Sequence, residues 1–272
     1  MLRVPREVKS FDGVGWGQKP QVKLAGGPTY HEIVFETNLL PEQIVMATLW
    51  LNGDPIVQMT GQQMVMLERY KKHWEEPGRF VMPLADISGA SLEGQSLSAL
   101  PTFPADNLIL QVQVAQEPAP NTQGSVALKA DAWVSRHVGV RSHISRITTT
   151  TFNAGANGRN ILDTLPNNGQ LIRRMHLLGD VANLRIRKDK NVVYEQDAGK
   201  NVYHLKRRKL APQAGYYHFD PVQSHFIRAE QFDTRVIESL EFEMDVNTPG
   251  NIAIFSEVLE PLKNPVGVQA AA

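Results

Sequence analysis

The chain has 272 residues, of which 42% are hydrophobic and 21% charged, as expected of a folded protein large enough for two modules of roughly 135 residues. Its 28 basic and 28 acidic residues balance, so the whole chain lacks the positive field that favours nucleic acid, and no direct nucleic-acid contact is expected. It contains no cysteine, which excludes disulfides, iron–sulfur clusters, thiol catalysis and cysteine-type zinc sites.

The first 27 residues are rich in glycine and are expected to form an irregular N-terminal arm that packs its aromatic residues on the body of the protein. The arm is mildly basic through Arg3, Arg6 and Lys9. Because it lacks the apolar run of a secretory signal, we expect synthesis in the cytoplasm.

The first module is expected over residues 28–135. Tyr30–Thr37 alternates apolar and polar residues and predicts a strand. Leu49–Pro83 predicts a strand, a tight turn at Asn52–Pro55, a second strand, a helix over Gly61–Trp74 and a third strand. A long loop is predicted next. It is followed by two alternating strands that we expect to pair as a terminal hairpin. The loop covers 85–105, and the two strands cover 108–116 and 126–134.

A shift in composition at 136–146, which holds three arginines and two histidines, predicts a linker between modules. The second module is expected over 147–259, with a strand at Leu171–Leu178 that corresponds to Tyr30–Thr37. Its terminal hairpin is predicted from Ser239–Val246 and Asn251–Val258. The tail, 260–272, is rich in proline and alanine and is expected to be loose.

The stretch Leu49–Pro83 occurs twice, because Leu184–Pro221 repeats its pattern. In this alignment Leu49 matches Leu184, Leu51 matches Ile186 and Asp54 matches Asp189. The basic helix ends at 69–72 and 206–209 also correspond, as do the segments 78–80 and 215–217. The repeat therefore predicts two modules of the same kind.

Short alternating strands between turns predict an all-β protein, since nothing in the chain alternates strands with long helices. We predict two tandem antiparallel jelly-roll β-sandwich modules, a double jelly roll, each with a short inserted helix.

The sequence offers little support for catalysis. It has no GxSxG elbow and no Walker-type phosphate loop. The best metal-like pattern is His218-Phe219-Asp220, with His225 and His204 nearby. We interpret His218 and Asp220 as ordinary polar residues at a strand end. No catalytic or cofactor-binding residue is therefore predicted, and a structural metal is left open.

The order of elements in the first half resembles a known family. A strand ends in Leu51-Asn52-Gly53, and the helix after it carries Leu67-Glu68-Arg69-Tyr70-Lys71-Lys72. The second half is similar in 161–166 and 182–187. This arrangement resembles the major capsid proteins of corticoviruses and related tailless bacteriophages that contain an internal membrane.

The resemblance implies a subunit that forms trimers with a pseudo-hexagonal footprint, which tile an icosahedral shell around a lipid membrane. It implies a location in the virion and, as partners, other copies of the chain, penton and minor capsid proteins, and the internal membrane surface. The candidate subunit contacts are the basic helix ends, and the candidate membrane-proximal residues are basic side chains of the arm. The former are Arg69, Lys71, Lys72, Arg207 and Arg208, and the latter Arg3, Arg6 and Lys9.

A second hypothesis is a two-module β-sandwich protein that binds or hydrolyses carbohydrate. Paired carboxylates such as Glu241 and Glu243 are compatible with it, although their alternation with apolar residues favours a solvated strand face. The missing secretion signal and the absence of a catalytic cluster favour the capsid reading. The two hypotheses predict different oligomeric states. A capsid subunit should form a tight trimer, whereas a carbohydrate-active protein should be a monomer that binds glycans.

Overall fold

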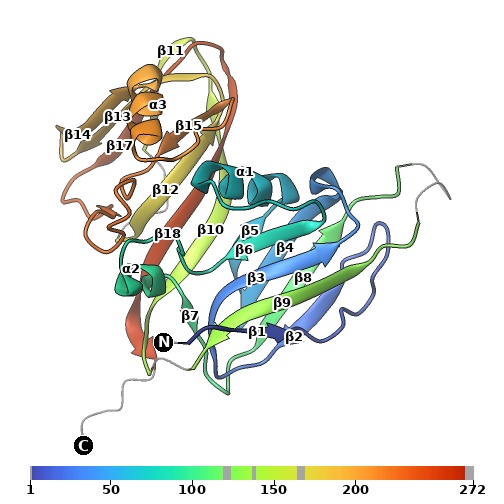
Figure 1. Cartoon of the computed structure of the whole chain (residues 1–272). Helices are drawn as coiled ribbons and strands as arrows, with labels where there is room; N and C mark the ends of the chain where they lie inside the picture. The colour runs from blue at the N-terminus through green and yellow to red at the C-terminus, as the bar shows by residue number, and fades with distance from the viewer. Residues whose placement is uncertain (1, 119–123, 137–138, 164–168, 267–272) are drawn as a thin grey trace, which may run out of the picture. The chain divides into compact units, whose positions relative to one another are not determined.

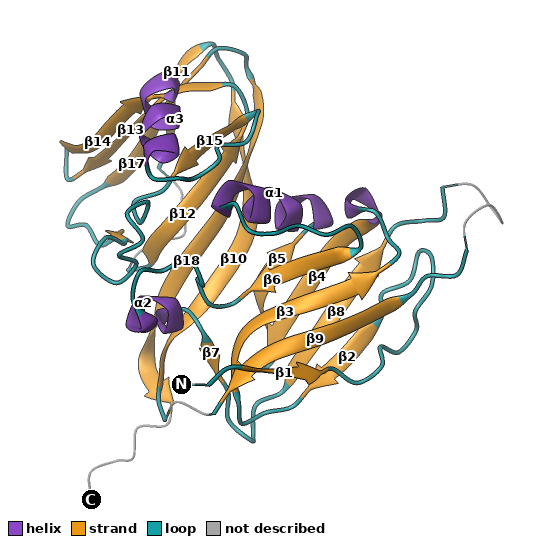
Figure 2. Ribbon diagram, viewed as in Figure 1, coloured by secondary structure: helices purple, strands orange, loops and turns teal. Residues whose placement is uncertain are grey.

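The computed structural model describes residues 2–118, 124–136, 139–163 and 169–266 (Figure 1). The chain folds into two compact units. The first comprises 1–69, 73–147 and 262–272, and the second comprises Tyr70–Lys72 together with 148–261. Strands dominate the described residues, which also include three short α-helices (Figure 2). Each unit is a sandwich of two sheets, as the alternating strands predict, and the strands pair antiparallel except where β10 (Arg141–Ala154) meets β5 (Asp54–Met59) in parallel.

The first unit contains two sheets that pack their apolar faces together. One sheet has the strand order β1-β9-β3-β6, with β7 on β3, and the other has the order β2-β8-β4-β5, which β10 joins through Ile147 and Val57. The strands of the first sheet are β1 (Val4–Glu7), β9 (Leu128–Ser135), β3 (Thr29–Thr37), β6 (Arg79–Pro83) and β7 (Leu100–Pro101). Those of the second are β2 (Gln21–Leu24), β8 (Leu108–Val114), β4 (Ile44–Leu51), β5 (Asp54–Met59) and β10 (Arg141–Ala154). Only the part of β10 up to Ile147 belongs to the first unit.

The second unit repeats this architecture. One sheet has the order β15-β12-β18, with β16 on β12, and the other has the order β11-β17-β13-β14. The strands of the first sheet are β15 (Tyr216–Phe219), β12 (Leu171–Leu178), β18 (Gly250–Val266) and β16 (Phe232–Asp233). Those of the second are β11 (Gly158–Leu162), β17 (Leu240–Val246), β13 (Val181–Lys188) and β14 (Asn191–Asp197). Ile172, Leu184 and Phe242 are among the buried residues of the core.

Each unit places a helix after its central hairpin. Helix α1 (Gly61–Lys71) follows β5, and helix α3 (Ala198–Arg207) follows β14. The start of α1 is fixed by Thr60 and Gln63, whose side chains each accept a hydrogen bond from the other's backbone N–H. At α3 the Asp197 carboxylate accepts from the Lys200 N–H at 2.9 Å. Both helices therefore begin at side-chain caps that the local sequence supplies.

The positions with positive φ set the register of the repeat. They are Asn52, Gly53, Lys72 and Gly78 in the first half and Asp189, Lys190, Lys209 and Gly215 in the second. Each position in the second half lies 137 residues after its counterpart, as in 189 − 52 = 137. The hairpin turns and the residues that end both helices thus share one backbone conformation.

The predicted hairpin alignment is therefore wrong by two residues. Asn52, rather than Asp54, corresponds to Asp189, while the basic helix ends and the two glycines were aligned correctly. The error arose because a shift of two residues in a strand keeps every side chain on the same face, so alternation alone does not reveal it.

The predicted terminal hairpins are also wrong. β8 and β9 lie in opposite sheets of the first unit, and β17 and β18 lie in opposite sheets of the second. Each of these strands has one buried face, and a strand buries one face whether its neighbour pairs with it or packs across the sandwich. The pattern predicts the buried face but not the partner.

Three segments expected to be irregular contain regular structure. The N-terminal arm supplies β1 and β2, which pair with β9 and β8. The predicted loop at 85–105 holds helix α2 (Leu92–Leu97), whose Ser91 side chain caps the Gly94 N–H. The tail forms part of β18 as far as Val266, and 267–272 lie outside the described residues.

Helix α1 and the predicted linker also differ from expectation. Lys72 adopts a φ of 56° and α1 ends at Lys71, so Trp74 lies beyond the helix and is 89% exposed. Within the predicted linker, 136–146, the residues from Arg141 onward already belong to β10. The first unit ends at Ile147 in this segment, and the second begins at Thr148.

Candidate assembly surfaces

The pattern His218-Phe219-Asp220 lies in the core of the second unit. His218 is 1% exposed and Asp220 is 4% exposed, so the interpretation of ordinary polar residues at a strand end is wrong. His204 is exposed on α3, and His225 lies beside the Arg208 carbonyl at 3.4 Å. Within the described parts of the chain, no group of three or more His, Asp or Glu side chains is placed to hold a metal.

His218 and Asp220 instead contact the end of helix α1. The Tyr70 ring stacks on His218 with 4.4 Å between the ring centroids, and it meets the edge of His176 at 5.1 Å. The Tyr70 hydroxyl donates to Asp220 Oδ2 at 2.8 Å. The next residue, Lys71, places its Nζ 3.4 Å from Glu257 Oε2. Two consecutive residues of α1 are thus fixed by polar side chains of the second unit.

The two buried histidines form a directed chain of hydrogen bonds. The Gln213 backbone N–H donates to His218 Nε2 at 2.9 Å, so the proton of a neutral His218 lies on Nδ1. His218 Nδ1 then donates to His176 Nδ1 at 2.6 Å. The proton of His176 consequently lies on Nε2, which is 3.5 Å from Glu257 Oε1. Because a protonated His218 could no longer accept from Gln213, this arrangement favours the neutral ring.

Burial and the neighbouring His176 lower the pKa of His218 to about 2, and burial also lowers the pKa of His176. Burial alone would raise the pKa of Glu257, but the charges of Lys71 and Arg174 outweigh it and hold that pKa below its ordinary value. At neutral pH the histidines are therefore uncharged and Glu257 is ionised.

Two arginines complete this buried polar cluster. Arg174 Nε donates to Asp220 Oδ2 at 2.9 Å, and its Nη1 lies 3.6 Å from Glu257 Oε2. Arg173 Nη2 lies 3.8 Å from the same Glu257 oxygen. Arg173 and Arg174 are 1% and 0% exposed. Removing one member of such a buried network leaves the other charges buried without partners, which lowers the free energy of unfolding by about 3–5 kcal/mol.

Four members of the cluster are not among the residues predicted from the sequence: Arg173, Arg174, His176 and Glu257. The signal was present in β12, where the letters RRMH interrupt an otherwise apolar strand (LIRRMHLL). Apolar residues on both faces of a strand indicate that both faces are covered, so polar residues within it are expected to be buried, and β12 is buried on both faces. Glu257 gave no such signal, because its partners are distant in sequence.

The predicted basic residues at the helix ends lie in different environments. Lys71 is the exception among them, since its side chain is 3% exposed and pairs with Glu257 inside the second unit. Lys72, Arg207 and Arg208 are exposed. Arg69 is also exposed and donates through Nε to both carboxylate oxygens of Glu75, at 3.0 and 2.9 Å.

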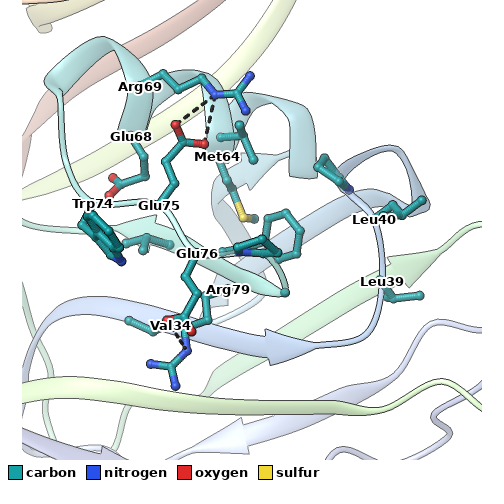
Figure 3. A pocket seen from close by; sticks show the side chains of 16 residues that line it. Val34, Leu39, Leu40, Met64, Glu68, Arg69, Trp74, Glu75, Glu76 and Arg79 are labelled. Carbon is teal, nitrogen blue, oxygen red and sulfur yellow. Dashed lines mark hydrogen bonds and ion pairs between the residues drawn. The ribbon is translucent and has the colours of Figure 1, made fainter.

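The first unit carries a pocket of about 610 Å³ beside α1 (Figure 3). Its floor includes Val34 of β3 and Val81 of β6, which pair across the sheet. Three carboxylates, a tryptophan and two arginines line its rim. The rim residues are Glu68, Glu75, Glu76, Trp74, Arg69 and Arg79. In Figure 3 the Arg69 side chain reaches Glu75, and Arg79 reaches Glu76.

The two halves of the chain match two family models. Residues 5–135 match the N-terminal domain, and residues 144–262 the C-terminal domain, of viral coat protein P2. The chain belongs to the viral coat protein P2 family. The assignment identifies a structural protein rather than an enzyme, in agreement with the prediction. No curated protein sequence matches the chain.

Solved structures share the fold of this coat protein. The major capsid protein P2 of bacteriophage PM2 has a TM-score of 0.87 at 17% identity, covering 97% of this chain and 99% of that one. The structure of Sulfolobus turreted icosahedral virus matches with a TM-score of 0.63 at 11% identity over 95% of this chain and 91% of the other. The capsid of PBCV-1 matches with a TM-score of 0.64 at 10% identity, covering 99% and 97%. The predicted double jelly roll is confirmed.

The three basic residues of the N-terminal segment lie in and around β1 of the coat protein. Arg6 and Lys9 are exposed, whereas Arg3 is partly buried and donates to Gln95 Oε1 at 3.2 Å. β1 pairs with β9 at the edge of its sheet, so these charges are held on a strand edge. Among the described residues, none of the helices combines the length and the apolarity that crossing a bilayer requires.

Proposed function

We propose that this coat protein is the major capsid subunit of an icosahedral, tailless bacteriophage with an internal membrane, and that three copies form each capsomer. The observation that carries the proposal is the duplication. Two units with the same sheet order and the same positions of positive φ allow a trimer to present six similar modules. Such a capsomer occupies a near-hexagonal site in a closed lattice.

The partners follow from this role. Five-fold vertices cannot accept a six-lobed capsomer, so we expect a separate penton protein and minor capsid proteins at special positions. The mature location is then the virion, after synthesis in the cytoplasm of the host. The exposed basic residues Arg69, Lys72, Arg207 and Arg208 remain the candidates for contact between subunits.

Light scattering on the purified full-length chain tests the trimer. We expect a mass three times that of the chain over a wide concentration range. A monomer at every concentration would contradict the proposal.

The basic N-terminal segment is proposed to face the membrane. Each positive charge near an anionic surface contributes about 1 kcal/mol, so Arg3, Arg6 and Lys9 bind weakly in one copy, and an assembled shell gains avidity from many. Assembled particles with and without residues 1–10 should differ in binding to vesicles that contain anionic lipid. Equal binding would remove this segment from the proposal.

A further inference from the structure

The outer face of the β15-β12-β18 sheet has a counterpart in the first unit. His176 of β12 pairs with His218 of β15, and Val34 of β3 pairs with Val81 of β6. Val81 and His218 are related by the register of the repeat, since 218 − 81 = 137. The pair Val34 and Val81 is therefore the equivalent of the two histidines that hold Tyr70.

These two equivalent faces differ in burial. In the second unit His176 and His218 are 0% and 1% exposed, and the Tyr70 ring lies on them. In the first unit Val34 and Val81 are only partly buried and form the floor of the acidic pocket. The first unit thus carries an open version of a site that is filled in the second.

The repeat also identifies the segment that matches the filling residues. Tyr70 and Lys71 precede the positive-φ residue Lys72, and Arg207 and Arg208 occupy the corresponding positions before Lys209. Both arginines are exposed. Within the described part of the chain, neither guanidinium has an ion-pair partner. The end of α3 is therefore an unpartnered copy of the segment that α1 contributes to the second unit.

The charges of the open site and the free segment are complementary. The pocket carries three carboxylates, Glu68, Glu75 and Glu76, against two guanidiniums, so it retains one net negative charge, whereas the end of α3 carries only positive side chains. The two guanidiniums of the pocket are those of Arg69 and Arg79, and the positive residues of α3 are Lys206, Arg207, Arg208 and Lys209. Burial and the charge of Glu68 raise the pKa of Glu32 beside this face, as expected where carboxylates gather. The exposed Trp74 ring at the rim offers a surface on which an arginine stacks favourably.

We propose that the basic end of α3 from one copy enters the acidic pocket of the first unit of a second copy, with Arg207 placed over Val34 and Val81. This inference rests on the proposed self-assembly and specifies the contact that makes it. On docking, the Arg207 side chain would leave water and contact Glu68, Glu75 and Trp74 of the second copy. The ion pairs that Glu75 and Glu76 form with Arg69 and Arg79 would become parts of an intermolecular network.

Cross-linking tests this placement, because the chain contains no cysteine of its own. The double variant Arg207→Cys/Val81→Cys should be linked between chains by a short bifunctional thiol reagent, since this pair is equivalent to Tyr70 and His218, whose ring centroids lie 4.4 Å apart. The control is Lys200→Cys/Val81→Cys. It places the thiol about 10 Å further along α3 and should not cross-link.

Charge reversal supplies an independent readout. Arg207→Glu/Arg208→Glu should raise the concentration at which trimers dissociate at least tenfold, as light scattering measures it. Lys19→Glu/Lys23→Glu makes the same change in net charge at exposed positions and should leave that concentration unchanged. Adding Glu75→Arg/Glu76→Arg to the α3 reversal should restore assembly.

The outcomes separate this inference from the proposed function. Trimers that neither cross-link at this pair nor respond to charge reversal would overturn the docking. The capsid role would stand, and the pocket would be open to another occupant, such as a minor capsid protein. A wild-type chain that stays monomeric would overturn the capsid role itself. Cross-linking of the specific pair without the control pair would support both.

Discussion

Acidification should weaken the second unit through His218. Its folded pKa is about 2, against an ordinary value of 6.5. Between these two values the unfolded chain binds a proton that the folded chain does not, so the free energy of unfolding falls as the pH falls below about 6.5. Integrated from about pH 7.5 to about pH 5, the loss is about 2 kcal/mol for this one histidine. Glu257 adds little in this window, because its contribution is lost only below about pH 4.5.

The test compares wild type with His218→Gln, which does not titrate but can still accept from Gln213 and donate to His176. The free energy of unfolding is measured with urea at both pH values and a fixed subunit concentration. The variant should lose about 2 kcal/mol less than wild type on acidification. The control His204→Gln removes an exposed histidine and should keep the wild-type pH dependence. If the free energy of unfolding of His218→Gln showed the wild-type pH dependence as well, the assignment of a buried neutral His218 would be refuted.

Three further predictions concern stability, each read from urea unfolding at neutral pH. Tyr70→Phe removes the hydroxyl that donates to Asp220 and should cost about 1.5–3 kcal/mol, whereas Tyr203→Phe, at an exposed site, should cost almost nothing; equal effects would contradict the role of the hydroxyl. Glu257→Gln should cost about 3–5 kcal/mol, because it leaves buried cations without their anion, and a change below about 1 kcal/mol would argue against the network. Gly215→Ala should cost about 1–2 kcal/mol for its φ of 79°. Gly78→Ala should cost more, since its added Cβ would lie 2.6 Å from the Thr37 carbonyl oxygen; a smaller loss at Gly78 would count against this geometry.

The fold class could be predicted because its signals are local. Alternation gives strands one buried face, and turn residues such as Asn52 and Gly53 mark the hairpin. The duplication could be predicted because two local signals recur with the same separation in sequence. The residues that end the helices, Lys72 and Lys209, lie as far apart as Gly78 and Gly215. Strand partners could not be predicted, since β8 and β9 show the same alternation whether they pair or face each other across the sandwich.

The buried polar cluster could not be derived because its members come from four distant segments. Lys71, Arg174, His218 and Glu257 are each ordinary surface residues by type, and only the folded chain brings them together. The prediction of basic helix ends treated Lys71 and Arg208 alike, although one is buried and the other exposed. Equivalent positions of a repeat need not share an environment, and here the difference points to a contact made by another copy.

Electron cryomicroscopy of assembled particles tests the capsid assignment most directly. We expect a closed icosahedral shell around a lipid bilayer, built from six-lobed capsomers into each of which three copies of this chain fit. Particles whose shell density cannot hold the chain, or capsomers with six copies rather than three, would contradict it.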